Sequence, residues 1–171
     1  LPSGQIDLAN CADFAALTPA TLQAVTAASG TINHWHLVEN RTSFERVARQ
    51  RKHDAGVIWL PGFPPGWWLA AVGRLLDLMP APAHIACDPD PAGIAIALKA
   101  AELWQQRGIA WLPWKMSATD LAALRARKPL SEYDRQHLAA LIAKAALPPY
   151  LSELAMWMLE HSEKGEQEGY L

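Results

Sequence analysis

Short apolar runs alternate along the chain with stretches in which apolar residues recur every three or four positions. The runs of strand length are Ile32–Val38, Ala55–Gly62, Ala83–Cys87 and Ile109–Trp114. The stretches with helical spacing between them are 42–52, 65–79 and 90–106. Continuous apolar strands separated by helices are typical of a parallel sheet that is covered on both faces. We therefore expect an α/β fold with a mainly parallel sheet of about four strands.

Local signals predict where helices begin and end. Thr18, followed by a proline, is a suitable N-cap for a first helix that we expect to end at Gly30. Thr42 and Glu45 have the spacing of a capping box, which predicts that the next helix begins there and continues to about Lys52. These signals divide the first part of the chain into well-defined elements.

The chain becomes helical after the last predicted strand. The expected helices are 118–125, 131–145 and 151–160, and the polar stretch that follows, 161–170, is expected to be loosely structured. The pattern predicts an N-terminal segment with one helix (1–30), an α/β core (31–115), and a helical extension with a polar tail (116–171).

Composition narrows the class of protein. Hydrophobic residues make up 51% and charged residues 19% of the 171 positions, as in an ordinary globular protein. No apolar run approaches the ~20 residues of a membrane span, and two cysteines are too few for a disulfide framework, so we expect a cytoplasmic protein with free thiols. The first residue, Leu1, is compatible with a fragment of a longer protein.

Acidic residues follow two of the predicted strands directly. Glu39 comes after the first strand, and Asp88 and Asp90 come after the third. Open parallel sheets bind ligands at the carboxyl ends of their strands, so the three carboxylates converge if these strands are neighbours. Such a group suits Mg²⁺ or Mn²⁺, and oxygen–metal bonds of ~2.0–2.6 Å predict that the three lie within one metal-bridging distance.

Each acid also has a local explanation that stays open. Asp90 precedes a proline and suits the N-cap of a helix. Asp88 suits a turn, and Glu39 would favour the dipole of the helix that follows it. These explanations do not require a ligand.

Basic residues crowd the helix that follows Glu39. They are Arg41, Arg46, Arg49, Arg51, Lys52 and His53. Arg46 and Arg49 share one helical face, which is suited to contacting phosphates beside a metal site, and we expect Arg41 to act with them. An ordinary solvated helix face is the alternative. The net charge of −2 gives no general attraction to nucleic acid.

These residues resemble a known family. Glu39 after one strand and Asp88-Pro89-Asp90 after another resemble the Toprim domain of topoisomerases, primases and related nucleases. More narrowly, the stretches VENRTSF, LPGFPPG and CDPDPAGI are similar to the C-terminal Toprim-like domain of the Wadjet anti-plasmid nuclease subunit (JetD) and its uncharacterised relatives, which are distant kin of the topoisomerase VI A subunit. The resemblance implies a Rossmann-like Toprim fold.

The resemblance also implies roles for individual residues. Asp88 and Asp90 would be ligands of Mg²⁺ or Mn²⁺, and Glu39 a further ligand or a general acid or base. The stretch GEQEG resembles a Leu-Glu-Gln-Glu element near the family's end, which adds Glu166 and Glu168 as candidate ligands. A glycine stands there in place of the family's leucine, and a disordered acidic tail is the alternative.

The function implied is magnesium-dependent cleavage of DNA phosphodiesters within a larger DNA-processing or anti-plasmid defence protein. DNA, and SMC-like subunits of a defence system, would be its partners, with no role for a membrane; the oligomeric state is not indicated. The alternative is a non-catalytic Toprim-like module that binds DNA or a partner. The family's N-terminal DNA-binding region has no counterpart here, and Cys87 stands where the family often has glycine.

Overall fold

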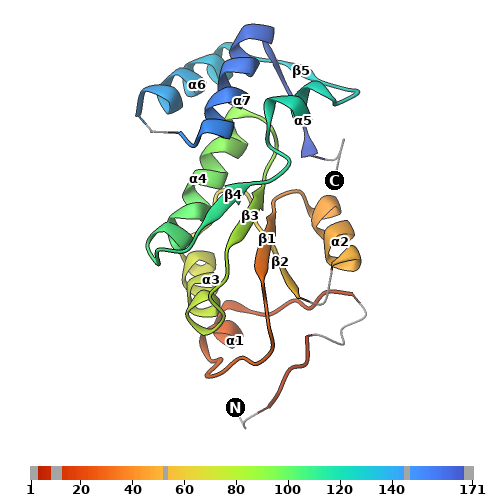
Figure 1. Ribbon diagram of the computed structural model, residues 1–171, viewed down its shortest axis with the longest axis vertical. Helices are drawn as coiled ribbons and strands as arrows, with labels where there is room; N and C mark the ends of the chain where they lie inside the picture. The colour runs from red at the N-terminus through yellow and green to blue at the C-terminus, as the bar shows by residue number, and fades with distance from the viewer. Residues whose placement is uncertain (1–3, 9–12, 52–53, 145–146, 168–171) are drawn as a thin grey trace.

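A four-stranded parallel sheet forms the centre of the protein (Figure 1). The computed structural model describes residues 4–8, 13–51, 54–144 and 147–167. The strands are β1 (His34–Val38), β2 (Ala55–Trp59), β3 (Ala83–Ala86) and β4 (Trp111–Pro113), in the order β2-β1-β3-β4. The expected α/β class and parallel sheet are confirmed, and β1 and β3 are neighbours.

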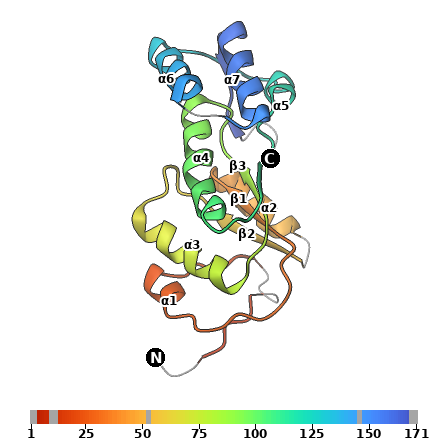
Figure 2. The same ribbon diagram turned by 60° about the vertical axis from the view of Figure 1, so that its left-hand side comes forward.

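Helices cover both faces of this sheet. They are α2 (Arg41–Gln50), α3 (Gly66–Leu78) and α4 (Pro91–Gln105). Figures 1 and 2 show α3 and α4 on one side and α2 on the other. Alternate strand residues face the two sides. Leu37 and Ile85 pack in the main core with α3 and α4, whereas Val38 packs in a smaller cluster with Phe44 of α2.

The first helix is shorter than its sequence predicts. Thr18 caps α1 (Pro19–Gln23) as expected, and its hydroxyl accepts a hydrogen bond from the N–H of Thr21 at 3.1 Å. The helix ends at Gln23, well before Gly30. Beyond this end, the carbonyl of Val25 accepts two hydrogen bonds, of 3.1 and 2.8 Å, from Arg74 of α3. These contacts hold the segment after α1 against α3.

The predicted capping box at Thr42 and Glu45 is wrong. Asn40 caps α2 instead, and its side-chain oxygen accepts from the N–H of Ser43 at 3.0 Å. Asparagine is among the best N-cap residues. Asn40 directly follows Glu39, so the helix begins at Arg41 and not after Thr42. Glu45 is then free to pair with Arg41 on the helix surface.

A helical layer lies beyond the carboxyl ends of the strands. It contains α5 (Ala118–Ala122), β5 (Lys128–Pro129), α6 (Glu132–Lys144), α7 (Pro149–His161) and β6 (Glu163–Lys164). The expectation of a loose tail is wrong for its described part, because β6 pairs with β5 and Gln167 is fully buried. This return of the chain decides what surrounds the acidic residues.

Candidate functional site

Glu39 and Asp88 meet at the carboxyl edge of the sheet. The last residue of β1, Val38, pairs with Ala86 of β3, so the residues that follow the two strands emerge side by side. The backbone N–H of Glu39 donates to the carbonyl of Ala86 at 3.0 Å. The N–H of Asp88 donates in turn to a carboxylate oxygen of Glu39 at 3.2 Å. The two acids share one edge, as the sequence predicts.

Asp90 lies in the same turn and caps α4. One of its carboxylate oxygens accepts from the N–H of Gly93 at 2.7 Å, and its own N–H donates to the carbonyl of Asp88 at 2.8 Å. A Cβ atom at Gly93 would lie 2.0 Å from that same carbonyl oxygen. The turn is therefore closed tightly against the first turn of α4 and presents both aspartates at the sheet edge.

The returning tail contributes a residue that sequence reasoning did not single out. The backbone N–H of Gln167 donates to Asp88 Oδ1 at 2.7 Å, and its side-chain oxygen accepts from the N–H of Asn40 at 3.0 Å. A feature of the sequence that could have indicated this contact is Gly165, two residues before Gln167. A Cβ atom at Gly165 would lie 2.3 Å from a methyl group of Leu124, so glycine lets the tail approach the turn.

Glu39, Asp88 and Asp90 form an acidic edge at the carboxyl ends of β1 and β3. Burial and nearby negative charge disfavour the ionised forms of Glu39 and Asp90. Burial, together with the charges of Asp88 and Asp90, raises the pKa of Glu39 from 4.5 to about 7, against the opposing effect of the Asp88 N–H. Burial likewise raises the pKa of Asp90. The buried thiol of Cys87, beside them, has its pKa raised well above the usual value. A cation at this edge would offset the clustered negative charge.

The carboxylates of Glu39, Asp88 and Asp90 are nevertheless not all close enough together to bind one cation as they stand. Among the described residues, three metal-ligating side chains come within 4.8 Å of one another at a group of histidines, and not at Glu39, Asp88 and Asp90. The expected metal-bridging distance among all three is therefore not met in this arrangement. Asp88 and Asp90 each turn an oxygen to a backbone N–H, so binding one cation through all three acids requires side-chain rotation.

The acids of the tail do not join this group through any described contact. Glu166 forms an ion pair with Lys128 of β5. Glu168 lies outside the described residues. Lys164 pairs with Asp134 at 2.9 Å, and its charge acts to lower the pKa of Asp90. The tail therefore brings one cation near the edge and supplies a backbone donor to Asp88.

The arginines of α2 reach outward beside the acidic edge. Arg41 follows the edge directly and pairs with Glu45 at 3.1 Å. Arg49, about 12 Å further along the helix, pairs with Asp13 of the N-terminal segment at 3.1 Å. Arg46 is exposed between them, and Lys52 and His53 lie outside the described residues. Of these arginines, Arg41 follows Glu39 most closely in the sequence.

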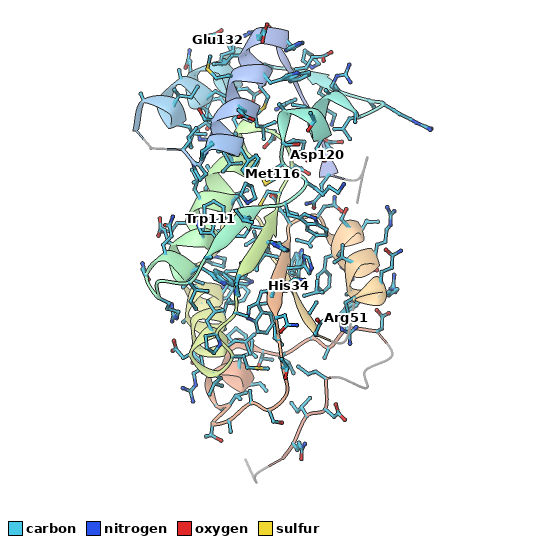
Figure 3. The ribbon with its side chains drawn as sticks, in the orientation of Figure 1. His34, Arg51, Trp111, Met116, Asp120 and Glu132 are labelled. Carbon is cyan, nitrogen blue, oxygen red and sulfur yellow. The ribbon has the colours of Figure 1, made fainter. Side chains whose placement is uncertain are left out.

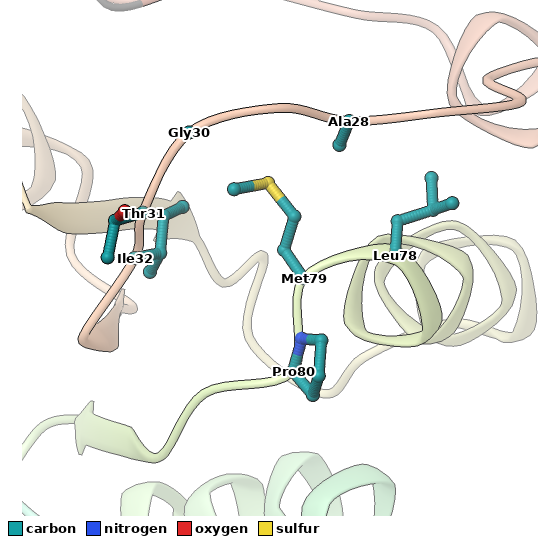
Figure 4. A pocket seen from close by; sticks show the side chains of 7 residues that line it. All are labelled: Ala28, Gly30, Thr31, Ile32, Leu78, Met79 and Pro80. Carbon is teal, nitrogen blue, oxygen red and sulfur yellow. The ribbon is translucent and has the colours of Figure 1, made fainter.

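A separate hollow lies at the opposite edge of the sheet (Figure 4). It encloses about 230 Å³ between the segment 28–32 and the end of α3 at Leu78–Pro80. None of its lining residues is ionisable, so it offers no charged group for catalysis. Among the described helices, none is long and apolar enough to cross a membrane.

Comparison with known proteins gives one family. The model for the family described as Protein of unknown function C-terminus (DUF2399) matches residues 15–171. The match includes the sheet, the acidic edge and the returning tail. No curated protein matches the chain.

Proposed function

We propose that this chain, which belongs to the family described as Protein of unknown function C-terminus (DUF2399), is a magnesium-dependent domain that cleaves DNA phosphodiesters in the manner of Toprim nucleases. The observation that carries the proposal is the shared edge of β1 and β3. There Glu39 and Asp88 are in hydrogen-bond contact and Asp90 lies in the same turn. Carboxylates at adjacent strand ends suit a hard divalent cation.

The sequence supports the narrower likeness. The blocks around Glu39 and Asp88-Pro89-Asp90 resemble the Toprim-like domain of the Wadjet nuclease subunit. We propose on this basis that the chain acts in the cytoplasm within a larger DNA-processing or anti-plasmid protein, with SMC-like subunits as partners.

The residues have distinct roles in this proposal. Asp88 and Asp90 would hold Mg²⁺ or Mn²⁺, with Glu39 completing the site after rotation of its side chain. The cation, when bound, supplies positive charge that offsets the charge developing on a phosphodiester. Without a cation, burial raises the pKa of Glu39 to about 7, so as an alternative to ligation this residue suits a general acid or base. Gln167 holds Asp88 in place through its backbone N–H.

DNA would reach the edge along α2. Arg41, Arg46 and Arg49 supply phosphate contacts in the proposal, but two of them are already paired with acids. The chain has 15 Lys+Arg against 17 Asp+Glu, and affinity for DNA comes mostly from neutralised phosphates. We therefore expect the 171-residue chain by itself to bind DNA weakly, with positioning supplied by other segments or partners.

The test is cleavage of plasmid DNA in Mn²⁺ or Mg²⁺ by the natural protein that contains this chain, together with its partners. We expect Glu39→Gln, Asp88→Asn and Asp90→Asn each to reduce cleavage by about 100-fold or more. Asparagine at 90 keeps the helix cap, so this loss would come from the missing charge and not from misfolding. Glu102→Gln, an exposed acid of α4 far from the edge, is the matched control.

A non-catalytic binding module is the second candidate. The observation that favours it is that Asp88 and Asp90 both accept hydrogen bonds from backbone N–H groups, which explains them without a metal. If the domain is such a module, the natural protein that carries both Asp88→Asn and Asp90→Asn would keep the activity of the wild type. Retention of full activity in this double variant would overturn the nuclease proposal.

A further inference from the structure

Three histidines gather on the face of the sheet that carries α2. His34 and His36 are two residues apart on β1 and so project to the same face, together with Val38, which packs against α2. His84 of β3 is paired with His36 across the ladder. Figure 3 shows His34 on this side of the sheet. The three side chains are each partly buried.

Their ring nitrogens are close enough to share an ion. The Nε2 atoms of His34 and His36 are 2.9 Å apart. The ring of His84 lies 5.1 Å from that of His34 and 5.3 Å from that of His36, measured between centroids. One nitrogen of each residue lies within 4.8 Å of the others. Zinc–nitrogen bonds of ~2.0–2.1 Å place two bound nitrogens about 3.4 Å apart, so modest rotations suffice.

Two of the three imidazoles, those of His36 and His84, are held in the neutral form that binds metals. Burial, with the nearby His34 and His84, lowers the pKa of His36 to about 4. Burial and His34 lower the pKa of His84 as well. Neutral imidazoles have a free lone pair at neutral pH. The Nδ1 atom of His36 is buried and has no hydrogen-bond partner among the described residues, so no described protein group competes for this ring nitrogen.

This group is distinct from the acidic edge. Glu39 lies beyond the end of β1, whereas the histidines lie within β1 and β3 beneath the ring of Trp114, whose centroid is 4.5 Å from that of His36. Imidazole nitrogens suit Zn²⁺, Cu²⁺ and Ni²⁺, and carboxylates suit Mg²⁺. Two sites of different chemistry therefore share the same two strands.

We propose that His34, His36 and His84 bind one divalent transition-metal ion of the zinc type, with a fourth position open to water or a small ligand. The fourth position is open because no carboxylate or thiolate of the described residues joins this group. The ion would tie β1 to β3, the strands that also present Glu39 and Asp88. This inference goes beyond the proposed nuclease function and does not depend on it.

The test uses the whole chain, freed of metal with a chelator and titrated with Zn²⁺ by calorimetry. We expect one Zn²⁺ per chain, with affinity reduced at least about 100-fold in His36→Gln and in His84→Gln. His137→Gln on α6 is the matched control and should bind as the wild type does. Asp88→Asn should also leave Zn²⁺ binding unchanged, which separates failure of this site from failure of the acidic edge.

A measurement without substitutions guards against misfolded variants. In nuclear magnetic resonance spectra, Zn²⁺ should shift the imidazole signals of His34, His36 and His84 and leave those of His137 and His161 in place. The proposal is overturned if the metal-free chain binds no Zn²⁺. It is also overturned if Zn²⁺ moves only histidines outside the group, or if the folded His36→Gln and His84→Gln variants bind as tightly as the wild type.

Discussion

Single side chains set the chemistry of the acidic edge. Glu39 is partly buried beside two other acids, and its carboxylate accepts only one described backbone hydrogen bond, from Asp88. Burial and like charge both favour its protonated form. This residue therefore links the stability of the metal-free protein to pH.

We expect Glu39→Gln to stabilise the metal-free protein at pH 8 and to leave it nearly unchanged at pH 4. The pKa rises from 4.5 to about 7 on folding, so the folded state gains most below pH 4.5 and loses this gain as the pH passes through 7. Gln is neutral at every pH and keeps an acceptor for Asp88. Urea unfolding in chelator should show a difference on the order of 2 kcal/mol at pH 8, allowing for solvent screening.

A stability difference between variant and wild type that is equal at the two pH values would contradict this assignment. His36 also makes the stability of the protein depend on pH, in the opposite sense to Glu39. Its pKa falls to about 4 on folding, so its contribution is lost as the pH falls below 6.5. The contribution of His36 is the same in the wild type and in Glu39→Gln, so it cancels in the comparison, which isolates Glu39.

At the scale of elements, the junction between β3 and α4 leaves little room for change. The turn 87–90 folds back on the first turn of α4, and the carbonyl of Asp88 occupies the space that a side chain at Gly93 would need. The junction holds both aspartates and the cap of a helix whose buried residues include Trp104. Changes here should act on the fold and the site together.

We expect Gly93→Ala to destabilise the protein by about 3 kcal/mol, at the upper end for overpacking, because its Cβ atom would lie 2.0 Å from a backbone oxygen. Gly66→Ala is the matched control. It too lies in the first turn of a helix, but a Cβ atom there meets nothing within 4 Å. The control should be neutral or gain up to about 1 kcal/mol. Thermal and urea unfolding give the change in stability for each variant. Equal changes for Gly93→Ala and Gly66→Ala would contradict the expectation, because the turn would then have moved to accommodate the methyl group.

At the scale of the whole molecule, the chain closes on itself at the acidic edge. Residues far apart in sequence meet there: the end of β1, the turn after β3, and the tail after β6 (Figure 1). Gln167 connects the cap residue Asn40 to Asp88. The last described part of the chain thus forms one wall of the candidate site.

We expect Gln167→Ala to loosen this closure. The N–H of Asn40 would lose its acceptor, at a cost of about 1–3 kcal/mol if it stays buried. Hydrogen exchange should become faster at the amides of Asn40, Gly165 and residue 167, while the amides shared by β1 and β3 keep their protection. Gln136→Ala on the exposed face of α6 is the control. Unchanged exchange at Asn40 would show that the tail does not close the site.

The sequence by itself determined the features that depend on near neighbours. The order of strands and helices follows from hydrophobic spacing, which acts over a few residues. Thr18 and Asp90 cap their helices as predicted, because a cap contacts an N–H only three positions away. The placement of Glu39 and Asp88 at strand ends follows in the same way, and parallel pairing then puts both at one edge.

Only the tertiary structure decided the features that depend on distant contacts. Arg74 of α3 binds the carbonyl of Val25 in the segment after α1, and Gln167 reaches Asp88 across 79 positions and Asn40 across 127. The histidine group exists because β1 lies beside β3 and the shared face is covered by a single helix. Such contacts depend on how whole elements pack, which no local pattern specifies. The spacing of the sequence therefore predicted the acids at the edge, whereas the tail was expected there only from the family resemblance, through Glu166 and Glu168 and not through Gln167.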